Sequence, residues 1–206
     1  FLGLIIIWRV NARKYISSGT VASAYDSWTQ DKLLERLWGE HIHLGFYPEF
    51  KKNVDFRKAK VQFVHELVKW SGLYKLPKGS RILDVGCGIG GSSRILAKYY
   101  GFNVTGITIS PAQVKRAREL TPFGLNCNFQ VMDALDLKFE DGSFDAVWSV
   151  EAGAHMNDKV KFADEMLRTL RPGGYLALAD WNSRDLKAYP PSIFEKLVLN
   201  QLLEQW

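Results

Sequence analysis

Residues Leu83 to Gly91, "LDVGCGIGG", decide the fold of this 206-residue chain. Around them, "RILDVGC" is typical of a short apolar strand and "GSSRILAKYY" of a helix. A strand that runs through glycines into a helix N-terminus is typical of the switch point of a parallel α/β sheet. Glycines at 86, 88 and 90 would let the backbone approach a ligand closely. Alone, the pattern is a weak signal, and a tight turn without a ligand is the alternative.

The sequence on both sides of this loop alternates between strand and helix patterns. Downstream, the strands are "NVTGITI", "CNFQVMDA", "FDAVWSVEA" and "GYLALADW", and the helices are "PAQVKRAREL" and "KVKFADEMLRTL", the latter closed by "RPGG". Ser110 is the expected N-cap of the first of these helices, with Pro111 at its first position. Upstream, Val21–Trp38 and Phe56–Leu73 have helical patterns. We therefore expect an α/β fold: a Rossmann-like, doubly wound parallel sheet with an N-terminal helical cap.

Composition limits the classes of protein to consider. The chain is 47% hydrophobic and 24% charged, as in ordinary globular domains. Its two cysteines, Cys87 and Cys127, give neither a disulfide framework nor metal-ligand spacing, so no metal site is expected. Residues 1–80 hold 13 Lys and Arg against 7 Asp and Glu, and this excess supplies the net charge of +5. Without a basic cluster interleaved with aromatics, we expect no nucleic acid partner and favour anionic lipid headgroups.

The chain opens with "FLGLIIIWRVNARK", eight nearly all-apolar residues followed by Arg9, Arg13 and Lys14. Eight residues cannot span a bilayer, because a span needs about 20. The segment is either the surviving end of a longer anchor or a strand-like piece packed on the domain. Basic residues directly after an apolar run fit the cytoplasmic flank of a membrane anchor.

Asp84 is a carboxylate inside an apolar strand, which costs free energy unless it is hydrogen-bonded or serves a ligand. A cationic ligand would suit it, whereas the pyrophosphate of a dinucleotide would be repelled. Dinucleotide folds also commonly carry an acid about 20 residues beyond the glycines to hold a ribose. No carboxylate lies between Asp84 and Glu119. Both the missing ribose acid and the repulsion by Asp84 therefore argue against a dinucleotide ligand.

The segments "ILDVGCGIGG", "FDAVWS" and "LRPGG" resemble the three motifs of class I S-adenosylmethionine-dependent methyltransferases. More narrowly, "YDSWTQDKLLERLWGEHIHLGFY", "GGSSRILAKYYGFNVTGITISPAQVKRA" and "VWSVEAGAHM" are similar to the tocopherol and prenyl-benzoquinol methyltransferases, most closely their cyanobacterial members. The similarity runs from about Ser17 to Trp206. It implies an apolar and basic segment 1–16, a helical cap 17–76 and a cofactor-binding core 77–206. That core would lack its C-terminal part, since the family continues through further strands and substrate-covering segments.

The resemblance implies S-adenosylmethionine as the cofactor and assigns roles in binding it. Asp84 and the carbonyl of Gly86 would serve the ammonium, within the loop that also contains Gly88 and Gly90. Asp133 would accept from the adenine amino group, or only cap a turn. The remaining expected contacts are Thr108, Ser110 or Gln113 with the ribose, the Ala134 amide with the adenine ring, and Ser149 and Val150 with the methionine part.

The cap is expected to close over the cofactor through Tyr25 and the segment His41–Gly45. As isolated features, these residues would more often be core aromatics and hydrogen-bonded core histidines.

The implied reaction is methylation of a ring carbon of a prenylated benzoquinol, of the tocopherol and plastoquinone pathway type. It requires an in-line approach to the methyl group, a dry site and removal of the phenolic proton. Transfer from a phenol to an ordinary histidine is uphill by about 5 kcal/mol. His155 is the first candidate base, or only a positioning residue, and Glu151 and His43 follow.

Two alternatives stay open: a methyltransferase of another branch acting on a small amine or a sterol, and a fragment that binds the cofactor without catalysis. The apolar N-terminal segment favours a lipid substrate. We expect a prenylated quinol substrate and a membrane-associated protein, on the cytoplasmic face in a cyanobacterium or in a plastid if the chain is eukaryotic. The sequence does not indicate the oligomeric state.

Overall fold

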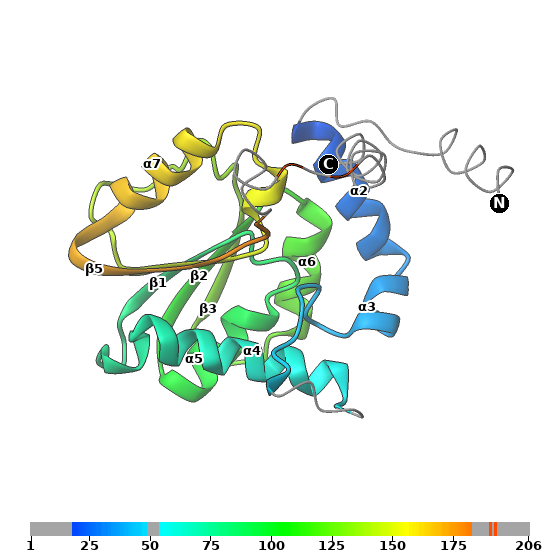
Figure 1. Ribbon diagram of the computed structural model, residues 1–206, viewed down its shortest axis with the longest axis horizontal. Helices are drawn as coiled ribbons and strands as arrows, with labels where there is room; N and C mark the ends of the chain where they lie inside the picture. The colour runs from blue at the N-terminus through cyan, green and yellow to red at the C-terminus, as the bar shows by residue number, and fades with distance from the viewer. Residues whose placement is uncertain (1–17, 49–53, 183–189, 191, 193–206) are drawn as a thin grey trace, which may run out of the picture.

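The computed structural model of the chain (Figure 1) describes residues 18–48, 54–182, 190 and 192. The apolar and basic segment 1–16 and the chain beyond residue 192 lie outside the described residues, and so do the expectations for them. No helix in the described ranges is both long and apolar enough to cross a bilayer.

Five parallel strands form the central sheet, in the order β3-β2-β1-β4-β5. The strands are β1 Arg81–Val85, β2 Asn103–Thr108, β3 Cys127–Val131, β4 Phe144–Val150 and β5 Leu170–Ala179. From β1 the chain proceeds outward through β2 and β3 on one side, and β4 and β5 lie on the other. The point where this order reverses lies between β1 and β4, and ligands of such sheets bind outside the carboxyl ends of the strands there. The expected doubly wound parallel sheet is confirmed.

Helices cover both faces of the sheet, as Figure 1 shows with α7 on one side and α4 and α5 on the other. The helices of these layers are α4 Phe56–Ser71, α5 Gly91–Tyr100, α6 Pro111–Leu120 and α7 Lys159–Thr169, with the 3₁₀ turns η2 Leu73–Lys75 and η3 Gly153–His155. On one face, Val64 and Leu96 pack against Ile82 and Trp148 of the sheet. On the other, Phe162 and Met166 of α7 pack against a second set of strand residues that includes Leu83 and Val85.

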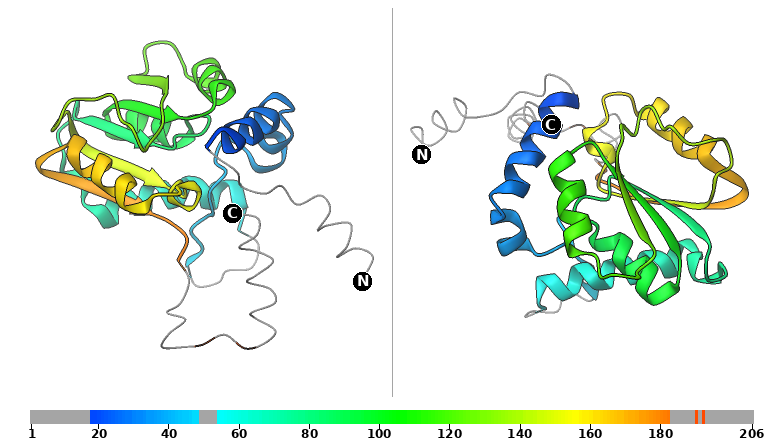
Figure 2. Two further views of the ribbon diagram at one scale, coloured as in Figure 1. Left: turned by 90° about the horizontal axis from the view of Figure 1, so that it is seen from above. Right: turned by 180° about the vertical axis from the view of Figure 1, so that it is seen from behind.

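The predicted helix Val21–Trp38 is two helices, α2 Ser18–Gln30 and α3 Leu33–Trp38. Lys32 has φ 51°, a left-handed conformation that a right-handed helix cannot continue through, so the chain turns there. Figure 2 shows α2 and α3 outside the sheet layers and beside α6. By contrast, α4 packs on the sheet itself, although the expected cap extended to residue 76.

Local capping signals fix the ends of several helices. The Ser110 hydroxyl accepts from the Gln113 amide at 3.1 Å and begins α6 as predicted, with Pro111 at the first position. Asp55 caps α4, which ends at Gly72 in a left-handed conformation. The "RPGG" turn differs from expectation. It lies inside β5, because Leu170 already pairs with Phe144 and a register shift follows before Tyr175 pairs with Ala146.

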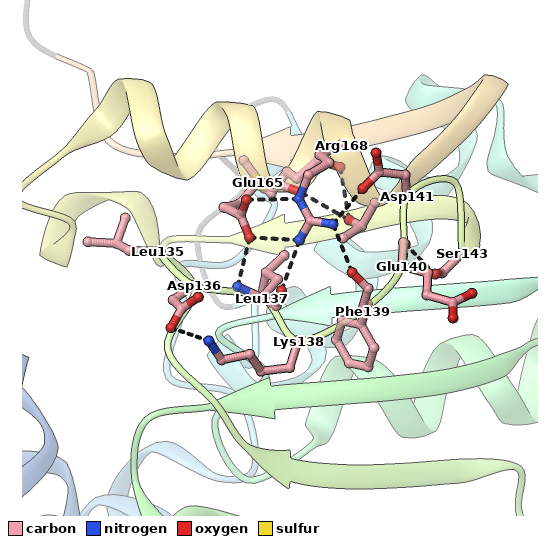
Figure 3. A network of polar contacts seen from close by, with 12 residues as sticks. Leu135, Asp136, Leu137, Lys138, Phe139, Glu140, Asp141, Ser143, Glu165 and Arg168 are labelled. Atoms are coloured by element: carbon pink, nitrogen blue, oxygen red, sulfur yellow. Dashed lines mark hydrogen bonds and ion pairs between the residues drawn. The ribbon is translucent and has the colours of Figure 1, made fainter.

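The loop between β3 and β4 is held by two side chains of α7, Arg168 and Glu165, of which Glu165 accepts from the Leu137 amide at 2.7 Å. Arg168 donates to the carbonyl oxygens of Leu137 and Phe139 at 2.9 and 2.8 Å and pairs with Glu165 and Asp141 (Figure 3). The Arg168 guanidinium makes five polar contacts, which hold this loop in place without regular secondary structure. The segment that follows the carboxyl end of β3 is thereby fixed on the sheet.

Candidate active site

A cavity of about 410 Å³ lies at the carboxyl ends of the strands, between the sheet and the cap. Its volume is in the range of small-molecule sites. The predicted residues that line it are Tyr25, His43, Asp84, Gly86, Gly88, Thr108, Gln113, Asp133, Ala134, Val150, Glu151 and His155. Gly90, Ser110 and Ser149 are the predicted site residues that are not part of its lining.

The glycine loop presents bare backbone to the cavity. The amides of Gly86 and Cys87 both donate to the Ile107 carbonyl oxygen at 2.9 Å, which ties the loop to β2. Gly86 has φ 77°, and an added Cβ would lie 2.4 Å from Cβ of Ala152. An added Cβ on Gly88, with φ 54°, would meet nothing within 4 Å. A ligand can therefore approach the Gly88 backbone directly, as a flat or charged cofactor group requires.

Asp84 is a nearly fully buried acid at the end of β1, only 2% exposed. Ser93 of α5 donates to its Oδ2 at 2.5 Å. Burial raises the pKa of Asp84 to about 7, and the Ser93 hydrogen bond opposes the rise. The carboxyl is therefore balanced between its two protonation states near neutral pH. A cation bound beside it would hold it ionised.

Thr108 and Gln113 form a neutral hydrogen-bonded pair in the region where dinucleotide-binding folds carry a ribose-binding acid. Thr108 Oγ1 donates to Gln113 Oε1 at 2.6 Å, which leaves the Gln113 amide nitrogen as a donor for a ligand. Ser110 does not share this role, because its hydroxyl caps α6 and donates to Asp26 of the cap. Asp26, to which no sequence motif pointed, also accepts from the Ala112 amide at 3.0 Å.

Two further predicted residues are occupied by structural contacts. Ser149 is fully buried and donates to the Val85 carbonyl oxygen at 2.9 Å, so its hydroxyl joins β4 to β1. Gly90 precedes α5 with φ 81°, and an added Cβ would lie 2.6 Å from the Phe129 ring. Both residues shape the wall of the cavity from behind.

Asp133 follows β3, caps a turn and lines the cavity. Its Oδ1 accepts from the Leu135 amide at 2.9 Å, so the residue does cap a turn. It also lines the cavity, beside Ala134, which is 7% exposed. The second carboxylate oxygen is left for a ligand.

Tyr25 and His155 meet across the cavity. The Tyr25 hydroxyl lies 2.8 Å from His155 Nε2, and the rings pack edge to face. Burial, helped by the charge of Glu151, raises the pKa of Tyr25 to about 12. Burial also lowers the pKa of His155, partly offset by Asp180. Both groups are therefore neutral at pH 7 and share one proton between the cap and the end of β4.

Residues 38–46, which we call the strap, begin at the last residue of α3 and line one side of the cavity. Lys60 Nζ of α4 donates to the carbonyl oxygens of Trp38 and His41, at 3.3 and 2.8 Å. Arg94 of α5 pairs with Glu40 at 2.6 Å and donates to the Ile89 carbonyl oxygen of the glycine loop at 2.8 Å. Sequence analysis missed these contacts, because a lysine or arginine on a helix is normally assigned to the solvent face.

Glu151 also binds the strap, since its Oε1 accepts from the Leu44 amide at 3.0 Å. It has φ 52°, which is rare for a residue with a side chain and is often found at functional sites. One of its carboxylate oxygens is thus committed to holding the strap. The role of base predicted for Glu151 stays a prediction.

His43 was predicted as a further candidate base, and its surroundings argue against that role. Its Nδ1 bonds to the Leu44 carbonyl oxygen at 2.7 Å and its Nε2 to His41 Nδ1 at 3.1 Å. Both ring nitrogens are engaged, so neither can take a proton from a substrate. His155 stays the leading candidate.

Comparisons with known proteins agree with this architecture. Residues 83–178 match the family described as "Methyltransferase domain". The chain is 59% identical over 200 residues to 2-methyl-6-phytyl-1,4-hydroquinone methyltransferase of Synechocystis sp., covering 97% of this chain and 63% of that protein. It is 39% identical over 191 residues to the chloroplastic tocopherol O-methyltransferase of Arabidopsis thaliana, covering 84% and 55%.

Solved structures give the same result. A putative sarcosine dimethylglycine methyltransferase from Galdieria sulphuraria superposes with a TM-score of 0.67 at 31% identity, covering 74% of this chain and 58% of that one. The [4+2]-cyclase SpnF superposes at 0.69 and 30% identity, covering 80% and 61%. The chain spans less than two thirds of the length of these relatives. By its fold, its glycine loop and these matches, the chain contains a methyltransferase domain, and it is similar over most of its length to the tocopherol and prenyl-quinol methyltransferases.

Proposed function

We propose that the chain catalyses S-adenosylmethionine-dependent C-methylation of a prenylated benzoquinol. The observation that carries the proposal is the 59% identity, over almost the whole chain, to a protein named 2-methyl-6-phytyl-1,4-hydroquinone methyltransferase. The relatives whose names specify methylation of oxygen or nitrogen are less similar, with identities from 34% to 41%. A ring-carbon acceptor is therefore favoured over an alkaloid or small-amine acceptor.

The cavity suits the proposed cofactor. S-adenosylmethionine supplies an electrophilic methyl group on a sulfonium when bound. Asp84, buried and able to ionise beside a cation, fits the ammonium of its methionine part. The Gln113 amide fits a ribose hydroxyl, and the free oxygen of Asp133 fits the amino group of adenine.

We assign Tyr25 and His155 to the removal of the phenolic proton. Their hydrogen bond crosses the cavity between the cap and η3, where an acceptor would lie beyond the methyl group. A substrate hydroxyl that donates to the Tyr25 oxygen could pass its proton along the pair to His155 Nε2. The pair is partly buried, so the proton would move in a site that is shielded in part from bulk water. His155 acts in this scheme as the final acceptor, and Tyr25 as the group that touches the substrate.

We also propose that the protein works at a membrane surface, where a prenylated quinol resides. The basic excess of residues 1–80 supports attraction to anionic lipids. Large apolar side chains of the strap and its surroundings add to this, with Trp38 46%, Leu44 54% and Tyr47 45% exposed. The cyanobacterial and chloroplastic sources of the relatives fit either a cyanobacterial or a plastid membrane.

The test is methyl transfer by the full chain from trideuteromethyl-labelled S-adenosylmethionine to a panel of prenylated benzoquinols, sterols and small amines. Mass spectrometry should find a trideuteromethyl group on a ring carbon of a prenylated quinol. Label on a sterol or an amine would replace the proposal with another branch. Binding of S-adenosylhomocysteine without transfer to any acceptor would favour the cofactor-binding fragment.

A further inference from the structure

Two histidines of the strap form a hydrogen-bonded chain that leads into the cavity. His43 Nδ1 lies 2.7 Å from the Leu44 carbonyl oxygen, and a carbonyl oxygen can only accept, so this nitrogen bears a proton. His43 Nε2 then has a lone pair to offer to His41 Nδ1, 3.1 Å away. His41 Nδ1 must therefore donate. In a neutral His41, this leaves Nε2 as a bare acceptor.

The surroundings keep both rings neutral. Burial lowers the pKa of His41 to about 3, with further contributions from His43, Arg94 and Lys60. Burial also lowers the pKa of His43, although the bond to Leu44 opposes this. Because its pKa is so low, His41 is a permanent hydrogen-bond acceptor at neutral pH and a poor base.

His41 lines the cavity. Within the described residues, Trp148 Nε1 is the only sealed side-chain nitrogen or oxygen without a hydrogen-bond partner. No hydrogen bond within the described residues involves His41 Nε2, so this atom is not sealed. A ligand donor can reach it.

His41 and Asp84 flank the same helical turn. The His41 ring lies against Gly91, the first residue of α5, where an added Cβ would be 2.9 Å from Nδ1 and Cε1. Ser93, two residues along that turn, donates to the Asp84 carboxyl group. Two acceptors beside one turn call for a positively charged ligand group with several N–H donors. A primary ammonium has three, whereas a phenolic hydroxyl has one.

Building on the proposed function, we propose that His41 Nε2 accepts a hydrogen bond from the α-ammonium of the methionine part of S-adenosylmethionine, alongside Asp84. His43 is then a positioning residue that fixes the proton of His41 on Nδ1. The strap thereby recognises the cofactor through a side chain and does not merely cover it. The same contact would let a bound cofactor hold the strap closed.

The test measures binding of two ligands to the full chain by calorimetry. One is S-adenosylhomocysteine, and the other is its analogue with hydrogen in place of the α-amino group. His41→Asn retains a donor near Nδ1 for His43 but has no acceptor near Nε2, whereas His41→Gln places an oxygen there. His65→Asn is the matched control, since His65 bonds to Tyr100 of α5 and does not line the cavity.

His41→Asn should weaken S-adenosylhomocysteine about tenfold, as for loss of one charge-assisted hydrogen bond. It should leave the deaminated analogue within about twofold, His41→Gln should recover most of the affinity, and His65→Asn should change neither ligand. Equal loss of both ligands, or no loss, in a folded His41→Asn protein overturns the inference. If that variant does not fold, His41→Gln decides: affinity lost equally for both ligands overturns it, and affinity retained for S-adenosylhomocysteine supports it.

Failure of the proposed function has a different signature. A parent chain that binds S-adenosylhomocysteine and methylates a prenylated quinol, with no effect of His41→Asn, removes this inference alone. A parent chain that binds neither ligand removes both.

Discussion

Cofactor binding should depend on pH through Asp84. The pKa of this carboxyl is raised to about 7 by burial, and the ammonium of the ligand requires its ionised form. About one carboxyl in eleven is ionised at pH 6 and ten in eleven at pH 8, so the affinity should rise about tenfold between these values. Asp84→Asn keeps the shape and removes the titration. It should bind more weakly at pH 8 and show no such rise.

Calorimetry with S-adenosylhomocysteine at pH 6, 7 and 8 and constant ionic strength measures this directly. Ser93→Ala provides a second check, because loss of the hydrogen bond that lowers the pKa of Asp84 should move the rise to higher pH. The variant Asp84→Asn retains the histidines of the cavity, so any slope that it keeps belongs to other groups. A parent affinity that is flat within twofold from pH 6 to 8 would refute the reasoning.

The same shift has a consequence for stability, with the opposite sign. The pKa of Asp84 is higher in the folded chain than the ordinary value of about 3.9. The folded state therefore binds the proton more tightly, and its stability falls as pH rises from about 4 to about 7. Without ligand, Asp84→Asn should melt at a higher temperature than the parent at pH 8. The difference should shrink towards pH 4.

Three further variants test the contacts around the cavity. His155→Asn should lower methyl transfer by about 10² to 10⁴ in steady-state assays without changing cofactor affinity; Tyr25→Phe added to it should cost little more, and full additivity would contradict a shared proton. Glu40→Gln removes the ion pair of Arg94 and should weaken the binding of S-adenosylhomocysteine about threefold to tenfold, as measured by calorimetry. Unchanged affinity would mean that the other bonds alone hold the strap. Arg168→Met should lower the free energy of unfolding in urea by about 1 to 3 kcal/mol, whereas no change would mean that the network in Figure 3 is replaced by water.

The sequence predicted those parts of the fold that depend on local chemistry. The helix Pro111–Leu120 begins and ends where expected, because Ser110 and Pro111 specify its start within one turn. The alternation of elements correctly predicted a parallel sheet with its switch point at the glycine loop. Within β5, the register shift could not be foreseen, since it depends on how Leu170 pairs with a strand far away in sequence.

The site was predictable at the strand ends and less so at the cap. Asp84 and Asp133, which the resemblance assigned to one site, both line the cavity, because parallel strands bring their carboxyl ends together. The contacts of Lys60, Arg94 and the paired histidines needed the path of the strap, which carries no periodic signal. His43 was therefore predicted as a candidate base, and its two hydrogen bonds, to Leu44 and His41, could not be foreseen.

A crystal structure of the full chain with S-adenosylhomocysteine tests the central claim most directly. We predict the ligand in the cavity between β1 and β4, with its ammonium between Asp84 and His41, its ribose at Gln113 and its adenine at Asp133. A ligand bound elsewhere, or in this cavity with its ammonium away from Asp84, would contradict the assignment of the site.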